Sequence, residues 1–294
     1  MIQARNKLSQ EELSEAKKLI NCCQAYDGTY RDPYLSNMLN FNPDMPAFFL
    51  YYEKGELVGL LTVYADDQDV EVAILVHPNH RRQGIARALY RSFEKETASY
   101  PIESVTFQTE RVFLEKYPEF ASNWGLVEDE ETETWLGKDR RPYPLTIVSN
   151  LDVLLADRSY QDQISQLKFQ AFSEEHESKE VVDRYVAKAL KDPESRLYIL
   201  LKDSQVIGTC TVDLSTNTNY FYGLAISELE RGKGYGSYLA KYLVNQLIEQ
   251  NDKEFQIAVE DSNVGAKRLY EKIGFVKQTQ VVYLNKKGAR DSEV

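Results

Sequence analysis

Residues 231–236, RGKGYG, decide the fold of this chain, because they read R-x-x-G-x-G between two different apolar patterns. The apolar run before them, residues 220–226, predicts a strand. After them, apolar side chains recur every fourth position and predict a helix with one buried face: Tyr235, Leu239, Leu243 and Leu247. Unpaired N–H groups and the positive end of a helix attract phosphate. The stretch therefore predicts a phosphate-binding loop or, without a ligand, a tight strand-to-helix turn.

The same frame occurs 150 residues earlier, as residues 81–86, RRQGIA. Two further matches keep nearly this spacing, since ELVG at 56–59 matches QVIG at 205–208 and GLV at 125–127 matches GFV at 274–276. Three matches in one order, at a spacing of half the 294 residues, predict a duplicated domain. Pro142 and Pro144 interrupt regular structure and place the seam, which gives domains of residues 1–143 and 144–294.

Both copies predict one order of elements: a helix, a hairpin, a strand that enters the loop, a helix and a closing strand. Ser9 is the expected N-cap of the first helix. The predicted ranges are 10–23, 48–52 with 57–64, 70–76 and 105–109 in the first copy, and 178–190, 197–201 with 206–214, 220–226 and 255–259 in the second. The fold class is therefore α/β, or α+β, with a mixed, mainly antiparallel sheet flanked by helices.

The composition describes a globular protein, with 43% hydrophobic and 28% charged residues. No apolar run approaches the roughly 18 residues that span a bilayer, and no apolar segment follows Arg5 and Lys7, so we expect a cytoplasmic protein without a membrane partner. A net charge of −11 opposes general nucleic-acid binding. Three cysteines and three histidines show no metal-ligand spacing, which predicts no metal site. The oligomeric state stays open.

Two nucleotide-binding motifs are excluded. The P-loop pattern G-x-x-x-x-G-K-[ST] does not occur in the sequence. Gly234 and Gly236 supply the first half of the dinucleotide fingerprint G-x-G-x-x-G, but Leu239 stands where its last glycine belongs. A hairpin before the loop also argues against a dinucleotide-binding βαβ unit.

Residues 263–275, NVGAKRLYEKIGF, read N-x-x-A-x-x-L-Y-x-x-x-G-F directly after the last predicted strand. Together with R-x-x-G-x-G, this resembles the GNAT superfamily of acyl-CoA-dependent N-acyltransferases. The resemblance covers both halves of the chain. The second half carries both motifs, and the first carries only residues 76–86, VHPNHRRQGIA. The resemblance implies two tandem GNAT-type domains that use acetyl-CoA.

In this family acyl-CoA lies in a cleft between the strand before the loop and the strand before the second motif. The resemblance implies that backbone groups of residues 224–226 pair with pantetheine, as an added strand does. Backbone N–H groups of residues 231–237 would hold the pyrophosphate. The expected acyl-CoA-binding residues are Leu224, Ala225, Ile226, Arg231, Gly232, Lys233, Gly234, Tyr235, Gly236, Ser237, Asn263 and Tyr270 in the second copy, and Val76, Arg81, Arg82, Gln83, Gly84, Ile85 and Ala86 in the first.

The expected catalytic residues are Tyr270, Asn263 and Ile226. An N–H group beside Ile226 would face the thioester oxygen, and the Tyr270 phenol would protonate or hydrogen-bond the departing thiolate. Asn263 and Tyr270 are seven residues apart and share one helix face, so the alternative is a helix N-cap and a core aromatic. No base is evident, because Glu260 and Asp261 equally suit the cap of that helix, and water-mediated deprotonation or no enzymic base fits as well.

The first copy departs from the second motif. Aligning Gly125 with Gly274 puts Ala121 opposite Tyr270, and Pro118 interrupts the helix. Three roles stay open for this copy: it binds CoA without transferring the acyl group, it binds nothing, or it shapes the substrate cleft of the second copy. We expect an N-acetyltransferase that acts on an amine of a small molecule or peptide, with catalysis in the C-terminal copy. The alternative is a non-catalytic acyl-CoA sensor that regulates a partner, and Tyr270 favours the enzyme.

Overall fold

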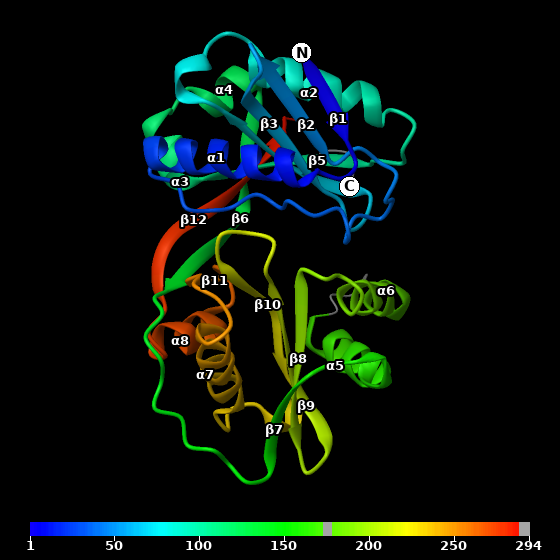
Figure 1. Ribbon diagram of the computed structural model, residues 1–294, viewed down its shortest axis with the longest axis vertical. Helices are drawn as coiled ribbons and strands as arrows, with labels where there is room; N and C mark the ends of the chain where they lie inside the picture. The colour runs from blue at the N-terminus through cyan, green and yellow to red at the C-terminus, as the bar shows by residue number, and fades with distance from the viewer. Residues whose placement is uncertain (173–177, 288–294) are drawn as a thin grey trace. The chain divides into compact units, whose positions relative to one another are not determined.

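The computed structural model describes residues 1–172 and 178–287, and the chain divides into two compact units (Figure 1). Unit 1 combines Met1–Thr134 with the residues from Gln278 onward, and unit 2 is Trp135–Lys277. Among the helices of these described residues, none is both long enough and apolar enough to cross a membrane.

Unit 1 holds a mixed sheet in the order β1-β2-β3-β4-β5-β12. Its strands are β1 (Ile2–Arg5), β2 (Phe48–Glu53), β3 (Glu56–Tyr64), β4 (Asp69–Val76), β5 (Ser104–Glu110) and most of β12 (Val276–Lys286). Neighbours pair antiparallel except β4 and β5, which run parallel. This confirms the predicted mainly antiparallel mixed sheet.

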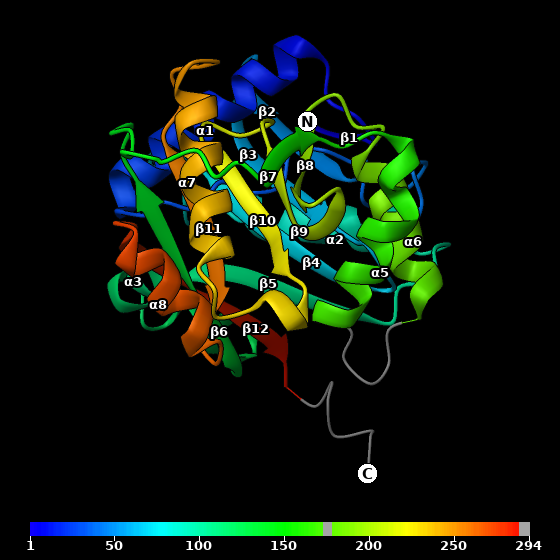
Figure 2. The same cartoon turned by 90° about the horizontal axis from the view of Figure 1, so that it is seen from below.

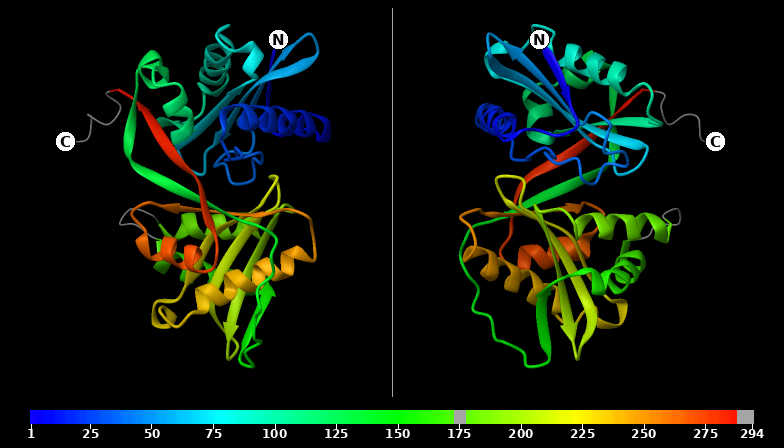
Figure 3. Two further views of the ribbon diagram at one scale, coloured as in Figure 1. Left: turned by 90° about the vertical axis from the view of Figure 1, so that its left-hand side faces the viewer. Right: turned by 45° about the vertical axis from the view of Figure 1, so that its right-hand side comes forward.

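The helices of unit 1 cover both faces of its sheet. They are α1 (Gln10–Asp27), the 3-10 helix η1 (Pro78–His80), α2 (Ile85–Thr97), α3 (Arg111–Lys116) and α4 (Phe120–Trp124). Along β2 the buried side chains alternate, since Phe48 and Leu50 pack with α1 whereas Phe49 packs with α2. Figure 3 shows α1 in blue and α2 in teal on opposite sides of these strands.

Unit 2 repeats this plan in the order β11-β10-β9-β8-β7, with the end of β6 (Leu126–Lys138) next to β11. The strands are β7 (Leu151–Leu155), β8 (Ser195–Lys202), β9 (Gln205–Asp213), β10 (Asn219–Ile226) and β11 (Phe255–Glu260). β10 and β11 pair parallel, whereas β7, β8, β9 and β10 pair antiparallel in that order from β7 to β10.

Helices also cover both faces of unit 2. They are the 3-10 helices η2 (Arg158–Tyr160) and η3 (Glu228–Glu230), and α5 (Gln161–Phe172), α6 (Lys179–Ala189), α7 (Tyr235–Ile248) and α8 (Val264–Lys272). Leu239 of α7 belongs to one core cluster and Ile164 of α5 to another. Figures 1 and 2 show α7 and α8 on one side of the strands and α5 and α6 on the other.

Local sequence signals account for much of this plan. Lys54 and Gly55 turn the first hairpin with φ of 53° and 85°, and Asp203 and Ser204 turn the second with 50° and 68°. Two successive left-handed residues match the right-handed twist of hairpin strands. Ser9 caps α1 in a capping box with Glu12, as predicted. The prediction missed β1, β6, β7, β12 and α5, and it gave no ranges for α3 and α4.

Two strands, β6 after β5 and β12 after β11, do not stay with the copies that precede them in sequence. β12 pairs antiparallel with β5, from Val281 opposite Glu110 to Asn285 opposite Thr106, and it places Val282 and Leu284 in the unit 1 core. β6 begins in unit 1 and places Leu136 in the unit 2 core. The predicted boundary near residue 144 separates the two sequence copies rather than the two compact units, and it stays a prediction.

Candidate functional site

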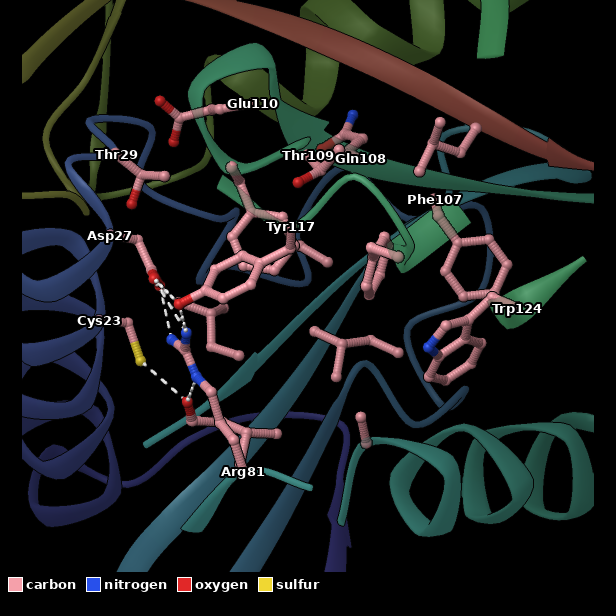
Figure 4. Close-up of a pocket in the computed structure, with 18 of the residues that line it drawn as sticks. Cys23, Asp27, Thr29, Arg81, Phe107, Gln108, Thr109, Glu110, Tyr117 and Trp124 are labelled. Atoms are coloured by element: carbon pink, nitrogen blue, oxygen red, sulfur yellow. Dashed lines mark hydrogen bonds and ion pairs between the residues drawn. The ribbon is translucent and has the colours of Figure 1, made fainter. Parts of the chain in front are cut away.

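In unit 1 the two parallel strands separate after a short paired stretch. β4 and β5 pair from Asp69 opposite Ser104 to Val72 opposite Phe107, where their register ends. Beyond this point the residues of both strands line a cavity of about 760 Å³, together with the loop before α2 and residues of α3 and α4 (Figure 4). Six of the seven residues predicted for the first copy line it, namely Val76, Arg81, Arg82, Gly84, Ile85 and Ala86. Gln83 is exposed and instead donates to the Asn79 carbonyl.

Unit 2 separates its parallel strands at the equivalent point. β10 and β11 pair from Asn219 opposite Phe255 to Phe221 opposite Ile257. A bulge follows in β10 between Tyr222 and Ala225, with Gly223 at φ +58°. Bulges leave backbone groups out of the ladder. The predicted residues Leu224, Ala225 and Ile226 therefore lie on the part of β10 that has left β11, and their pairing with pantetheine stays a prediction.

The two glycine loops share one backbone shape. Gly232 and Gly234 have φ of 75° and 87°, and Arg82 and Gly84 have 63° and 82°. Gly84 and Gly234 are the N-caps of α2 and α7, and neither receives a side-chain cap. Both helices thus begin with N–H groups that no capping side chain occupies, which is the arrangement that binds phosphate.

The first arginine of each R-x-x-G motif holds the glycine loop by a hydrogen bond to the preceding strand. Arg81 Nε donates to the carbonyl of Val76 at 2.9 Å, and Arg231 Nε donates to that of Ile226 at 3.1 Å. Each arginine thereby ties the glycine loop to the last residue of the preceding strand. From the sequence we expect Arg231 to bind acyl-CoA, and we do not predict this contact of its side chain with the strand. Lys233 pairs with Glu230 at 3.1 Å.

A buried carboxylate in unit 1 collects several polar groups. The Asp27 side chain, at the end of α1, is 4% exposed and accepts from Arg81 Nη1 at 2.9 Å and from Nη2 at 2.5 Å. The Tyr117 hydroxyl lies 3.1 Å from Asp27 Oδ1, and burial together with this carboxylate raises the pKa of Tyr117. Figure 4 shows these three side chains pointing toward one another. No local sequence pattern predicts this cluster, because its members are 36 to 90 residues apart.

Asn263 and Gly274 fix the two ends of α8. The Asn263 side chain accepts from the N–H of Ala266 at 3.0 Å, so the alternative role of Asn263 as a helix N-cap is observed, and its catalytic and acyl-CoA-binding roles stay predictions. The cap is therefore not Glu260 or Asp261, because the side-chain amide of Asn263 already occupies the orphan N–H. Gly274, at φ +88°, donates to Glu271, and the next N–H reaches the carbonyl of Tyr270. These two bonds form a Schellman motif.

Tyr270 lies in the core of unit 2, where it is 4% exposed. Its ring centroid is 5.9 Å from that of Phe275, the hydrophobic contact that accompanies a Schellman motif. Burial raises its pKa well above the ordinary value, and the nearby Cys210 thiol adds to the shift. The phenol therefore stays protonated at neutral pH. The core-packing role is observed, and the catalytic role stays a prediction.

The first copy has no phenol at the matching position. α3 ends at Lys116 and α4 begins at Phe120, so Pro118 separates two short helices, as predicted. The α3 residues FLEK at 113–116 also match LYEK at 269–272, a match that the alignment on Gly125 missed. Leu114 then takes the place of Tyr270 and is similarly buried, at 8% exposure. Both alignments put an apolar residue there.

The family model of the acetyltransferase (GNAT) family matches residues 13–112 and 161–275. The chain belongs to the GNAT acetyltransferase family. A mycothiol acetyltransferase of Clavibacter sepedonicus is 25% identical over 230 residues, which are 74% of this chain and 73% of that protein. GNAT membership accounts for both glycine loops and both separating strand pairs.

Two solved structures share the GNAT fold over nearly the whole chain. A GCN5-related N-acetyltransferase from Sphaerobacter thermophilus has a TM-score of 0.70 at 17% identity and covers 97% of this chain and 95% of its own. A tandem GNAT protein from the clavulanic acid biosynthesis pathway has a TM-score of 0.69 at 17% identity and covers 97% of each chain. At this identity the likeness shows the fold, and it confirms the tandem arrangement of two GNAT domains.

Proposed function

We propose that this protein transfers an acetyl group from acetyl-CoA to an amine of a small molecule or peptide, with catalysis in the C-terminal copy. One observation carries the proposal. In unit 2, strand β10 leaves β11 beside a glycine loop that opens α7, and the second motif follows β11. Membership of the GNAT family and a relative named as an acetyltransferase support the acyl group and its donor.

The loop of unit 2 fits a diphosphate. A Cβ built on Gly232 or on Gly234 meets no atom within 4 Å, so the backbone faces open space at both positions. The N-terminus of α7 adds its N–H groups and the positive end of the helix dipole. Gly236 differs, because its Cβ would lie 3.0 Å from Leu269 Cδ1. This glycine lets α7 approach α8 closely.

Acetyl-CoA would supply an acetyl thioester, and the protein groups would orient it and handle charge. Backbone N–H groups near the β10 bulge would donate to the thioester oxygen as negative charge grows there. The Tyr270 hydroxyl would donate to the departing sulfur. Because burial raises the pKa of Tyr270, donation of a hydrogen bond is favoured over full proton transfer.

For the first copy we propose acyl-CoA binding without transfer. Its cavity of about 760 Å³ lies where β4 and β5 separate and reaches the loop that opens α2. Leu114 or Ala121 stands where a phenol would be needed. The cavity therefore supports acyl-CoA binding among the three possibilities left by the sequence. The apolar residue at the position that matches Tyr270 supports the absence of transfer, since the Tyr117 hydroxyl, which is also in this cavity, bonds Asp27.

The test is a screen of an amine panel with acetyl-CoA, followed by release of free thiol. We expect turnover with at least one amine, loss of that turnover in Gly234→Asp and its retention in Gly84→Asp. The reverse pattern would move catalysis to the first copy. Tight binding of acetyl-CoA without turnover of any amine would support the sensor instead.

A further inference from the structure

We propose that Lys168 is the general base of the C-terminal copy and takes a proton from the acceptor amine. This inference rests on the proposed function. It fills the role that neither motif supplies, since Asp261 pairs with Lys267 at 3.1 Å and the Glu260 side chain is exposed next to Ser262.

The Lys168 side chain reaches from α5 to the bulge of β10. It is 7% exposed, and its Nζ lies 3.4 Å from Thr211 Oγ1 of β9 and 5.9 Å from the ring centroid of Tyr222. A Cβ added to Gly223 would lie 2.5 Å from this Nζ. A side chain at position 223 would thus displace the amine, so the glycine leaves room for it.

This location is where an acceptor would meet the thioester. Gly223 lies two residues after Phe221, the last residue of β10 that pairs with β11. α5 packs on the face of the sheet opposite α7, so Nζ approaches the bulge from the side away from the phosphate-binding loop. A cavity of about 630 Å³ on this side is lined by Gln166, Phe169 and Gln170 of α5 and by residues 227–229. The cavity borders α5, which carries Lys168, and the residues that follow β10, although Lys168 itself does not line it.

The surroundings of Lys168 favour its neutral form. Among the described residues, the ion pairs include none with Lys168. The buried Cys210 thiol of β9 and the ring of Tyr222 of β10 favour the charged amine, but the cost of burial outweighs the effect of Cys210 and lowers the Lys168 pKa. On the elements that contact α5, Asp213 of β9 accepts from Ser215 and Asp183 of α6 pairs with Lys179.

Burial lowers the pKa of Lys168 to about 8. Near pH 7 about a tenth of the molecules would then carry a neutral amine at this position, compared with a negligible fraction for an ordinary lysine. A lysine desolvated in this way can act as a base at physiological pH.

The proposed step balances as follows. The acceptor arrives as an ammonium and gives one proton to neutral Nζ of Lys168, which becomes an ammonium. The freed amine attacks the thioester carbonyl carbon, forming the C–N bond, and the C–S bond breaks. The second amine proton ends on the departing sulfur as the thiol, and Lys168 returns its proton to solvent.

The kinetic test compares Lys168→Met with the wild type between pH 7 and pH 10, on an amine identified in the panel. Methionine keeps the apolar stem and removes the titrating group. We expect kcat/KM to fall on the order of 10²-fold at pH 7.5 and the loss to shrink to a few-fold at pH 10, where the free amine needs no base. Lys179→Met, on the exposed surface of α6, is the control and should match the wild type.

A pH-independent loss, or a rise in KM confined to acceptors that carry a carboxylate, would overturn the proposal, because Lys168 would then serve as an anion-docking group. Competitive labelling with acetic anhydride gives a test without turnover. We expect Lys168 to titrate near pH 8 and to be protected by acetyl-CoA, unlike Lys179. An ordinary titration near pH 10.5 would also overturn the proposal. A wild type that acetylates no amine would instead refute the proposed function.

Discussion

At the scale of single residues, Tyr270 joins two roles that one substitution can separate. Its ring packs against Phe275, whereas its hydroxyl is the group with chemistry to offer. Tyr270→Phe keeps the ring, so we expect the free energy of unfolding to fall by about 1 kcal/mol or less. The hydroxyl acts on sulfur only as thiolate charge develops, so kcat should fall on the order of 10²-fold with little change in the Kd for acetyl-CoA.

Steady-state kinetics, calorimetry and thermal unfolding of the same preparation check this expectation. The rate loss should be smaller with an acyl donor whose thiol has a lower pKa, since that leaving group needs less help. A variant with near wild-type kcat would leave Tyr270 with its packing role alone.

Arg82 carries backbone strain at the position that Gly232 fills in the second loop. Its φ of 63° costs a residue with a side chain about 1 kcal/mol. Arg82→Gly should therefore raise the free energy of unfolding by about 0.5 kcal/mol, after the added freedom of glycine in the unfolded chain is subtracted. Urea denaturation would measure this. The control is Gln83→Gly, one residue further along the same loop. It adds the same conformational freedom to the unfolded chain but relieves no backbone strain, so it should lower the free energy of unfolding.

Lys168 makes the stability of the fold depend on pH. Its pKa is about 8 when folded and about 10.4 when unfolded, so the unfolded chain binds more protons between these values and stability rises with pH there. Lys168→Met removes this dependence. We expect the variant to be more stable than the wild type by about 3 kcal/mol at pH 7 and to lose most of this advantage by pH 10.5. Equal differences at both pH values in denaturant titrations would contradict the lowered pKa.

At the scale of elements, the loop before α7 should decide whether acetyl-CoA binds to the second copy. Gly234→Asp puts a carboxylate and a side chain where the backbone would approach the pyrophosphate, so calorimetry should show this site lost. The control is Gly55→Asp, because Gly55 turns a hairpin with φ +85° and equally open space around its Cβ. Gly55→Asp places the same strain in a turn that has no phosphate site, so this variant should bind acetyl-CoA as the wild type does.

The helices and strands also show how much of the fold could be predicted from the sequence. Apolar period, turn residues and capping residues act within a few positions, so they predicted both hairpins, α2, α7 and the cap of α8. Asp27 meets Arg81 across 54 residues, and Lys168 meets Thr211 across 43. Such contacts depend on which helix packs on which face of a sheet, and no local pattern encodes them. Similarly, β4 and β5 were predicted as strands, but the point where they separate was visible only in their register.

At the scale of the whole molecule, two glycine loops of one backbone shape predict more than one binding event. Titration with acetyl-CoA should give between one and two sites per chain. We expect the tighter site to disappear in Gly234→Asp and a weaker one in Gly84→Asp, since Arg82 and Ala86 leave the first loop competent. Two sites that both survive Gly234→Asp would show that this loop holds no acyl-CoA.

The pairing of β12 with β5 sets an order of events during protein synthesis. β5 is made long before residues 281–285, which supply its antiparallel neighbour. Until the ribosome releases them, the nascent first unit lacks Val282 and Leu284 from its core and presents the edge of β5, a surface that invites pairing with other chains. A gene cut between the two sequence copies would make that transient state permanent, and its product should collect in inclusion bodies, although the cut falls outside every helix and strand of the first copy.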